Sequence, residues 1–143
     1  MSDIVKRCTD ADALYAFLCK IDNSLPVPLS QRVNLKKFAA RAVERIVYTI
    51  EDNGEVVSAA LFYYDFLDQS FAYFDLLGTV PGYEGRGYAR ILMDAAEESA
   101  RNAGMTEFHL HTNASNEKAV GVYSRRGYEI IETEPKLHMA KKL

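Results

Sequence analysis

The chain has 143 residues, of which 48% are hydrophobic and 26% are charged, and its formal net charge is −3; this length predicts one domain over residues 1–143. The acidic balance argues against a nucleic-acid partner, and no apolar run approaches the roughly 20 residues that a membrane helix needs. The chain opens without a secretory signal pattern, and its cysteines, Cys8 and Cys19, lack metal-site spacing, so we expect a cytoplasmic protein with reduced thiols, no membrane partner and no metal.

The first part of the chain predicts a short strand followed by two helices. Residues 4–7 are the candidate strand. Thr9 or Asp10 is a suitable cap for a helix whose apolar residues recur at helical spacing, namely Leu14, Phe17, Leu18 and Ile21. Pro26 and Pro28 exclude a continuous helix through the next segment. A second, shorter helix is then marked by Leu35, Phe38, Ala39 and Ala42.

Three runs of β-branched and aromatic residues follow. Two of them, within residues 45–66, flank the Asn53-Gly54 pair, which favours a tight hairpin turn. The third run covers residues 70–80. The second and third runs are apolar on both alternating faces, so we expect helices on both faces of the sheet.

The rest of the chain predicts a long helix, a strand, a further helix and two final strands. The long helix ends at Gly104, and its buried face is traced by Ile91, Leu92, Ala95, Ala96 and Ala103. Ser115 or Asn116 is expected to cap the further helix, which runs through Ala119, Val122 and Tyr123 and is closed by Gly127. The predicted order is β-α-α-β-β-β-α-β-α-β-β, an α/β layer fold with a mixed sheet.

Three glycines, Gly82, Gly85 and Gly87, lie where the third strand pattern changes into the long helix. Glycines let a phosphate group approach the free N–H groups at a helix N-terminus, which carry roughly half a positive charge. A plain strand-to-helix turn is the alternative, but the interleaved Arg86 and Arg90 favour an anion site. A dinucleotide motif lacks its third glycine here, and no Gly-Lys-Ser/Thr of a P-loop is present.

Two segments carry a family resemblance. Residues 84–89 read Glu-Gly-Arg-Gly-Tyr-Ala, and residues 116–128 read Asn-x-x-Ala-x-x-x-Tyr-x-x-x-Gly-Tyr. In this order and separation they resemble the acetyl-CoA signature, Gln/Arg-x-x-Gly-x-Gly/Ala, and a downstream motif of the GNAT superfamily of N-acyltransferases. The resemblance extends over nearly the whole chain and implies a mixed, mostly antiparallel central sheet flanked by helices on both faces.

The resemblance also implies a reaction, in which an amine directly attacks the thioester of acetyl-CoA. It assigns the pantetheine arm to Leu77, Gly78 and Thr79 and the pyrophosphate to Gly85, Arg86, Gly87, Tyr88, Ala89 and Arg90. Asn116 corresponds to an asparagine that contacts CoA, and Tyr123 to the residue that protonates the leaving thiolate. A Tyr hydroxyl with a pKa near 10 keeps its proton at neutral pH, which suits that role.

Glu84 departs from the signature, whose first position is Gln or Arg. A carboxylate beside a pyrophosphate is repulsive, and the helix dipole contributes only about 0.3–1 kcal/mol in compensation. We therefore expect the Glu84 side chain to turn outward, with Arg86 or Arg90 supplying the cation.

His111 is the first candidate for a general base that deprotonates the acceptor amine. It lies on the predicted strand over residues 107–112, at the position of the catalytic Glu in bacterial ribosomal-protein N-terminal alanine acetyltransferases. A histidine pKa near 6.5 suits base catalysis at neutral pH. Asp75 and a water chain are the alternatives. His109, on the same face as His111, is interpreted as a hydrogen-bonded sheet histidine.

The acceptor is less well defined by the sequence. Acidic residues without any Lys or Arg between them either steer a cationic amine or form a solvated hairpin; they are Glu51, Asp52, Glu55, Asp65, Asp68 and Asp75. Aromatic residues of the same segment belong to the core or stack on a sugar or base; they are Phe62, Tyr63, Tyr64, Phe66, Phe71, Tyr73 and Phe74.

Three functions remain open. The short chain favours acetylation of a small amine or amino sugar, and acetylation of a protein N-terminus or lysine is the second. The departure at Glu84 keeps open a non-catalytic acyl-CoA-binding module. By analogy with the family, the C-terminal strands are a candidate homodimer interface.

Overall fold

The computed structural model describes residues 3–65, 67 and 70–143. Phe66 and Asp68, which the sequence analysis named, lie outside the described residues. The elements, in chain order, are β1 (Lys6–Arg7), α1 (Ala11–Ile21), the 3₁₀ turns η1 (Asp22–Ser24) and η2 (Leu29–Gln31), α2 (Leu35–Ala42), β2 (Ile46–Asp52), β3 (Glu55–Asp65), β4 (Phe71–Thr79), α3 (Tyr88–Asn102), β5 (Glu107–Thr112), α4 (Glu117–Arg125), β6 (Glu129–Glu132) and β7 (Leu137–Lys142). Strands and α-helices follow the predicted order.

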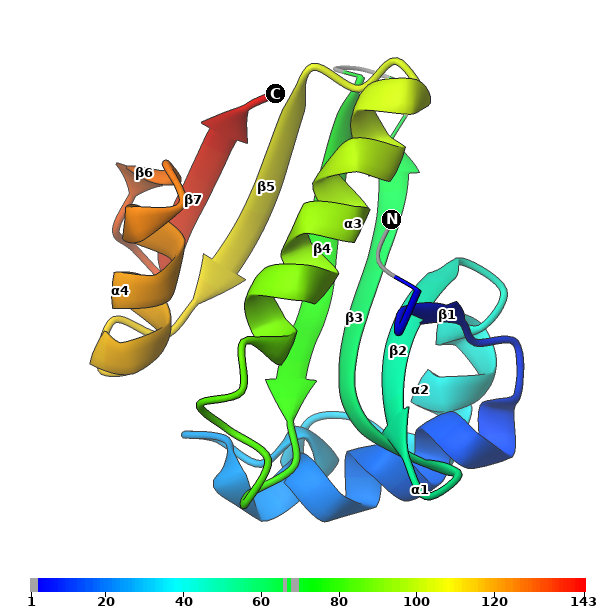
Figure 1. Ribbon diagram of the computed structural model, residues 1–143. Helices are drawn as coiled ribbons and strands as arrows, with labels where there is room; N and C mark the ends of the chain where they lie inside the picture. Colours follow the sequence, from blue (N-terminus) through cyan, green and yellow to red (C-terminus); the bar gives the residue numbers. More distant parts are fainter. Residues whose placement is uncertain (1–2, 66, 68–69) are drawn as a thin grey trace.

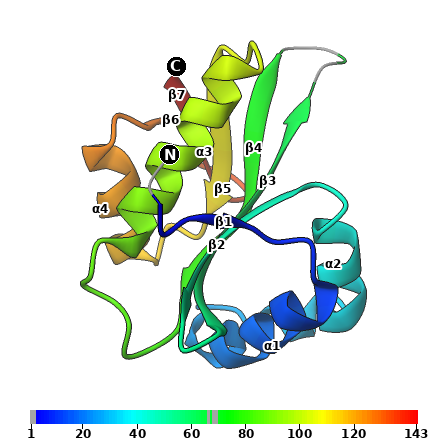
Figure 2. The ribbon, with the colours of Figure 1, turned by 45° about the vertical axis from the view of Figure 1, so that its right-hand side comes forward.

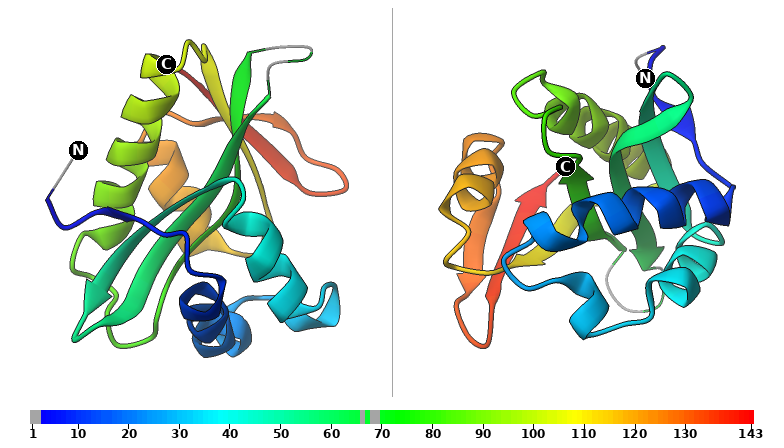
Figure 3. Two further views of the ribbon diagram at one scale, coloured as in Figure 1. Left: turned by 90° about the vertical axis from the view of Figure 1, so that its right-hand side faces the viewer. Right: turned by 90° about the horizontal axis from the view of Figure 1, so that it is seen from below.

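The strands form one sheet in the order β1-β2-β3-β4-β5-β7-β6. The pair β4–β5 is parallel, and the other five pairs are antiparallel. Helices α1 and α2 cover one face of this sheet, and α3 and α4 cover the other (Figures 1, 2 and 3). Each face therefore has its own hydrophobic core, which confirms the mixed sheet with helices on both sides.

Local sequence signals explain where the first elements begin and turn. Asp10 is the N-cap of α1, because its carboxylate accepts hydrogen bonds from the backbone N–H groups of Asp12 and Ala13 at 3.0 and 3.2 Å. Asn53 and Gly54 both adopt positive φ, 52° and 79°, as the tight hairpin turn between β2 and β3 requires.

The buried face of α3 differs in part from the prediction. Leu92, Ala95 and Ala96 are buried as expected, but Ala103 is exposed, because the helix ends one residue before it. Met93, Glu97 and Ala100 complete the buried face instead.

The central strands diverge, and this divergence positions the site. β4 pairs with β5 only from Phe71 to Phe74, whereas β5 pairs with β7 along its whole length. The second half of β4, residues 75–79, therefore has no strand on its β5 side within the described residues, although it stays paired with β3. Figure 1 shows the two ribbons separating at this point. Backbone N–H and C=O groups along this edge are available to a ligand.

Candidate active site

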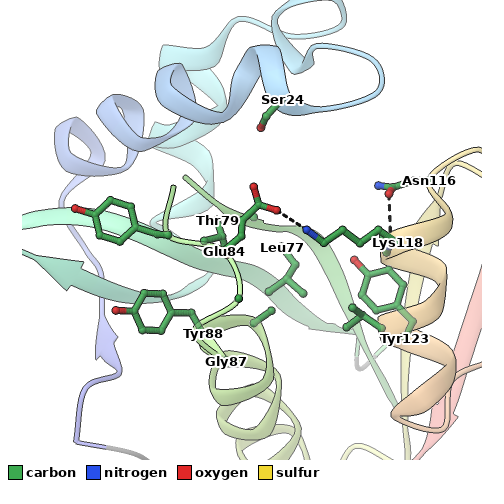
Figure 4. Close-up of a pocket in the computed structure, with 15 residues that line it drawn as sticks. Ser24, Leu77, Thr79, Glu84, Gly87, Tyr88, Asn116, Lys118 and Tyr123 are labelled. Atoms are coloured by element: carbon green, nitrogen blue, oxygen red, sulfur yellow. Dashed lines mark hydrogen bonds and ion pairs between the residues drawn. The ribbon is translucent and has the colours of Figure 1, made fainter. Parts of the chain in front are cut away.

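A cavity of about 420 Å³ opens where β4 and β5 diverge (Figure 4). Four parts of the chain meet there: the end of β4, the loop before α3 with the first turn of that helix, α4 from its cap to Tyr123, and the turn η1. The lining residues are Ser24, Leu77, Gly78, Thr79, Tyr83, Glu84, Gly85, Gly87, Tyr88, Ala89, Asn116, Lys118, Ala119, Val122 and Tyr123. Residues far apart in sequence, including both motif segments, thus surround one space.

The glycine turn presents a helix N-terminus to this cavity. Gly85 and Gly87 have φ values of 78° and 81°, a region that L side chains rarely adopt. Gly87 is the N-cap of α3, and no side chain caps that helix. The first backbone N–H groups of α3, on cavity-lining Tyr88 and Ala89, are therefore suited to bind an anion.

Tyr123 projects from α4 into the same cavity (Figure 4). Its ring packs against the core next to Tyr128, with ring centroids 6.1 Å apart. Burial raises the pKa of Tyr123 to about 12, so the hydroxyl is a proton donor throughout the neutral range.

Asn116 has a structural role in addition to its place in the motif. It caps α4, because its side-chain oxygen accepts a hydrogen bond from the Ala119 N–H at 3.3 Å. Asn116, and not Ser115, is therefore the N-cap. The cap holds the side chain at the edge of the cavity and leaves its amide nitrogen as the end that can face a ligand (Figure 4).

The expectation for Glu84 was wrong. Its side chain lines the cavity and forms an ion pair with Lys118 of α4, with 2.7 Å between Oε2 and Nζ. Arg86 instead lies over the ring of Tyr83, 4.6 Å from its centroid. Arg90 lines a separate cavity beside Glu97 on the outer side of α3. Neither predicted arginine lines the main cavity, although the Arg90 guanidinium lies close to Gly87, 3.8 Å from the position of a Cβ added there.

Lys118 was missed by the sequence analysis. Its position two residues after the cap Asn116 carries no motif signal. Only the packing of α4 beside the loop before α3 brings its ammonium group to Glu84.

His111 lies on the opposite face of the sheet and does not line the cavity. Phe108 and Leu110 of β5 point into the core under α3, so the alternating His109 and His111 point to the other face. There, the Tyr73 hydroxyl of β4 lies 2.5 Å from Nδ1 of His111. Desolvation lowers the pKa of His111 below its usual value near 6.5, and Lys136 adds to the effect.

Asp75, the alternative base, and His109 are both engaged in structural contacts. Asp75 forms an ion pair with Arg45 at 3.0 Å, although burial raises the pKa of Asp75 in opposition to this pairing. His109 contacts Glu107 through Nε2 at 2.8 Å and His138 through Nδ1 at 2.7 Å. His109 is thus the hydrogen-bonded sheet histidine that we expected.

Ion pairs and hydrogen bonds compensate most of the acidic segment. Glu51 pairs with Lys6, Glu55 pairs with Lys20, and Asp75 pairs with Arg45. Asp52 accepts a hydrogen bond from the Tyr83 hydroxyl at 2.7 Å and so ties the hairpin to the glycine loop. These contacts favour the interpretation of a solvated hairpin over that of a steering surface.

The described residues hold neither a metal-binding cluster nor a membrane-spanning helix. No group of three or more His, Cys, Asp or Glu side chains there is arranged to hold a metal ion. None of the helices in that part of the chain is long and apolar enough to cross a membrane.

Comparison with known proteins places this geometry in a family. Residues 12–128 match the model of the acetyltransferase (GNAT) family. An acetyltransferase of Pectobacterium atrosepticum is 32% identical over 82 residues, which cover 57% of this chain and 56% of that protein. The chain thus spans about half the length of that relative.

Two solved structures illustrate the similarity of fold. The PaiA N-acetyltransferase of Thermoplasma acidophilum, in complex with coenzyme A, superposes with a TM-score of 0.78 over 100% of both chains at 13% identity. The ribosomal-protein-S18-alanine N-acetyltransferase of Escherichia coli gives a TM-score of 0.76 at 20% identity, over 96% of this chain and 92% of that chain. With most of its length matched by the family model, the chain belongs to the acetyltransferase (GNAT) family.

Proposed function

We propose that this protein is an N-acetyltransferase that uses acetyl-CoA to acetylate a primary amine by direct attack. The observation that carries the proposal is the cavity between β4 and α4, where an uncapped helix N-terminus and the hydroxyl of a half-buried tyrosine, Tyr123, share one space. Acetyl-CoA, when bound, supplies an acetyl thioester with a thiolate leaving group.

The residues that would hold acetyl-CoA are those whose backbone groups or side-chain amide face the cavity. The unpaired edge of β4 at Leu77, Gly78 and Thr79 offers backbone groups to the pantetheine amides. The N–H groups at the start of α3, after Gly85 and Gly87, suit the pyrophosphate. Asn116 offers its amide nitrogen at the opposite wall.

Tyr123 is the proposed general acid. Because its pKa is raised to about 12, the hydroxyl is protonated at neutral pH. It donates this proton to the sulfur of the departing thiolate as the new amide bond forms.

His111 is the proposed base, and its hydrogen bond defines how the proton arrives. Burial raises the pKa of Tyr73 to about 12, so its hydroxyl keeps its proton, and in the proposed path it donates this hydrogen to the lone pair on Nδ1 of His111. Neutral His111 then carries its own hydrogen on Nε2. The amine therefore gives its proton to the Tyr73 oxygen while the Tyr73 hydrogen moves to Nδ1.

A small primary amine or amino sugar is the proposed acceptor. Tyr63 and Tyr73 form an aromatic pair, with centroids 5.6 Å apart, on the face that carries His111, and such rings suit the apolar face of a sugar. A protein N-terminus is the second candidate, because the Escherichia coli neighbour is a ribosomal-protein alanine N-acetyltransferase.

Release of free thiol from acetyl-CoA in the presence of pools of amines tests the function. The pools are sugar nucleotides, polyamines, amino acids and peptides with free N-termini. Thiol release with one pool, and a product heavier by one acetyl group, supports the proposal. Binding of acetyl-CoA without acetylation of any pool would instead identify a non-catalytic acyl-CoA-binding module.

We expect His111→Ala and Tyr73→Phe each to lower kcat about a hundredfold near pH 7, because each interrupts the same proton path. His111 has a lowered pKa and is neutral at this pH, whereas the amine is still charged. The deficit should shrink above pH 9, as the amine loses its proton to solvent. The measurement is the pH profile of each variant and of the double variant, which should be no slower than either single one. Additive losses would contradict a shared path.

We expect Gly87→Ala to cost about 1 kcal/mol of stability, because alanine is strained at a φ of 81°. Space is not limiting, since an added Cβ would lie 3.8 Å from the Arg90 guanidinium. Gly104→Ala is the matched control, with a φ of 90° and no place in the cavity. Denaturant unfolding should show similar losses for both, while calorimetry should show weaker acetyl-CoA binding only for Gly87→Ala. Equal binding by the two variants would argue against the glycine loop as the pyrophosphate site.

A further inference from the structure

An ion pair crosses the mouth of the main cavity. Glu84 reaches from the loop before α3, and Lys118 reaches toward it from α4, with 2.7 Å between the charged atoms (Figure 4). Both residues line the cavity. The pair thus joins its two walls at the end where the N-terminus of α3 is exposed.

Lys118 is the only cationic side chain among the lining residues in the part of the chain that the structure describes. Arg86 rests on the ring of Tyr83, and Arg90, whose guanidinium lies near Gly87, lines another cavity. A diphosphate at the start of α3 would therefore meet one negative side chain, Glu84, and one positive side chain, Lys118. These two side-chain charges act together with the N–H groups at the start of α3 on a dianion at the mouth.

The ion pair between Lys118 and Glu84 is exposed, so either side chain can exchange its partner readily. The side chains of Lys118 and Glu84 are 76% and 49% exposed, and exposed ion pairs of this kind contribute little to stability. A flexible lysine gains more from a doubly charged phosphate group near a helix N-terminus than from one solvated carboxylate.

We propose that Lys118 is the cation that binds the diphosphate of acyl-CoA in this protein, and that Glu84 holds it across the cavity until the ligand takes it. The proposal rests on the proposed use of acetyl-CoA. It adds Lys118, which occupies a position that neither motif specifies. It explains how the chain keeps an acidic residue at the first position of the signature: Lys118 compensates its charge in the free protein and faces the phosphates in the complex.

Calorimetric titration of the full chain with CoA, and with pantetheine as a phosphate-free probe, tests this proposal. Lys118→Gln should weaken CoA binding about tenfold, because a charge-assisted contact is lost and Glu84 is left unpaired. Glu84→Gln should tighten CoA binding several-fold, because Lys118 is released. Pantetheine should bind all variants equally, and the differences for CoA should diminish at 1 M salt.

Lys6→Gln is the matched control, because Lys6 also forms an exposed ion pair, with Glu51, and lies outside the cavity. It changes the net charge by the same amount and should leave CoA binding unchanged. Equal CoA affinities for Lys118→Gln and the wild type would overturn the role of Lys118. Weaker CoA binding by Glu84→Gln would overturn the release by Glu84. A wild-type protein that binds no CoA would instead refute the proposed function itself.

Discussion

Replacing Tyr123 with phenylalanine is expected to lower kcat about 100- to 1,000-fold, which is the range for loss of a general acid. The hydroxyl is the only group removed, and the ring keeps its packing beside Tyr128. Without a proton donor, the thiolate must leave as an anion in a partly buried cavity, which raises the barrier. The KM for acetyl-CoA should change little, since the lost contact acts on the leaving group rather than on the bound thioester.

Steady-state kinetics of thiol release at pH 7 measures this effect. Tyr15→Phe is the matched control, because Tyr15 is an exposed residue of α1, and it should retain the wild-type kcat. Thermal unfolding of both variants shows whether the fold is intact. A folded Tyr123→Phe enzyme with the wild-type kcat would remove Tyr123 from the mechanism.

Glu97→Ala is expected to destabilise the protein by about 3 kcal/mol, the lower end of the cost of breaking a buried ion pair. Glu97 is 2% exposed and lies among three cationic side chains, those of Arg101, Arg126 and Lys141. Lys141 contacts it at 2.8 Å and Arg126 at 3.2 Å, and the Tyr128 hydroxyl donates to it at 3.0 Å. Its loss would leave these groups without their common acceptor. The lower end applies because Arg126 and Lys141 still reach solvent.

Asp94→Asn is the matched control, because Asp94 lies one turn earlier on α3 and pairs with the same Arg126 at 2.7 Å. That carboxylate is 62% exposed, so its loss should cost less than about 1 kcal/mol. Chemical denaturation followed by circular dichroism measures both variants. Equal losses of unfolding free energy for the two variants would show that the burial of Glu97 does not increase its contribution to stability. Glu97 joins α3 to the segment after α4 and to β7, so it holds together the two helices that form the cavity walls.

The order of elements was predictable because it depends on short-range signals. Hydrophobic spacing, the Asp10 cap and the Asn53-Gly54 turn each act within a few residues and do not need the rest of the fold. The same holds for Gly87 and Asn116, which begin α3 and α4. Cavity-lining residues of the two motif segments were located for this reason, since each segment starts a helix that faces the divergence of β4 and β5.

Contacts between distant segments could not be predicted in this way. The sequence alone determined the helices, the strands, the glycine turn and the place of Tyr123 on α4. Only the tertiary structure decided that Glu84 meets Lys118, that Tyr73 meets His111 and that Arg86 lies over the ring of Tyr83. The physical reason is that a long charged or aromatic side chain finds its partner by the packing of whole elements, and 34 residues separate Glu84 from Lys118 along the chain.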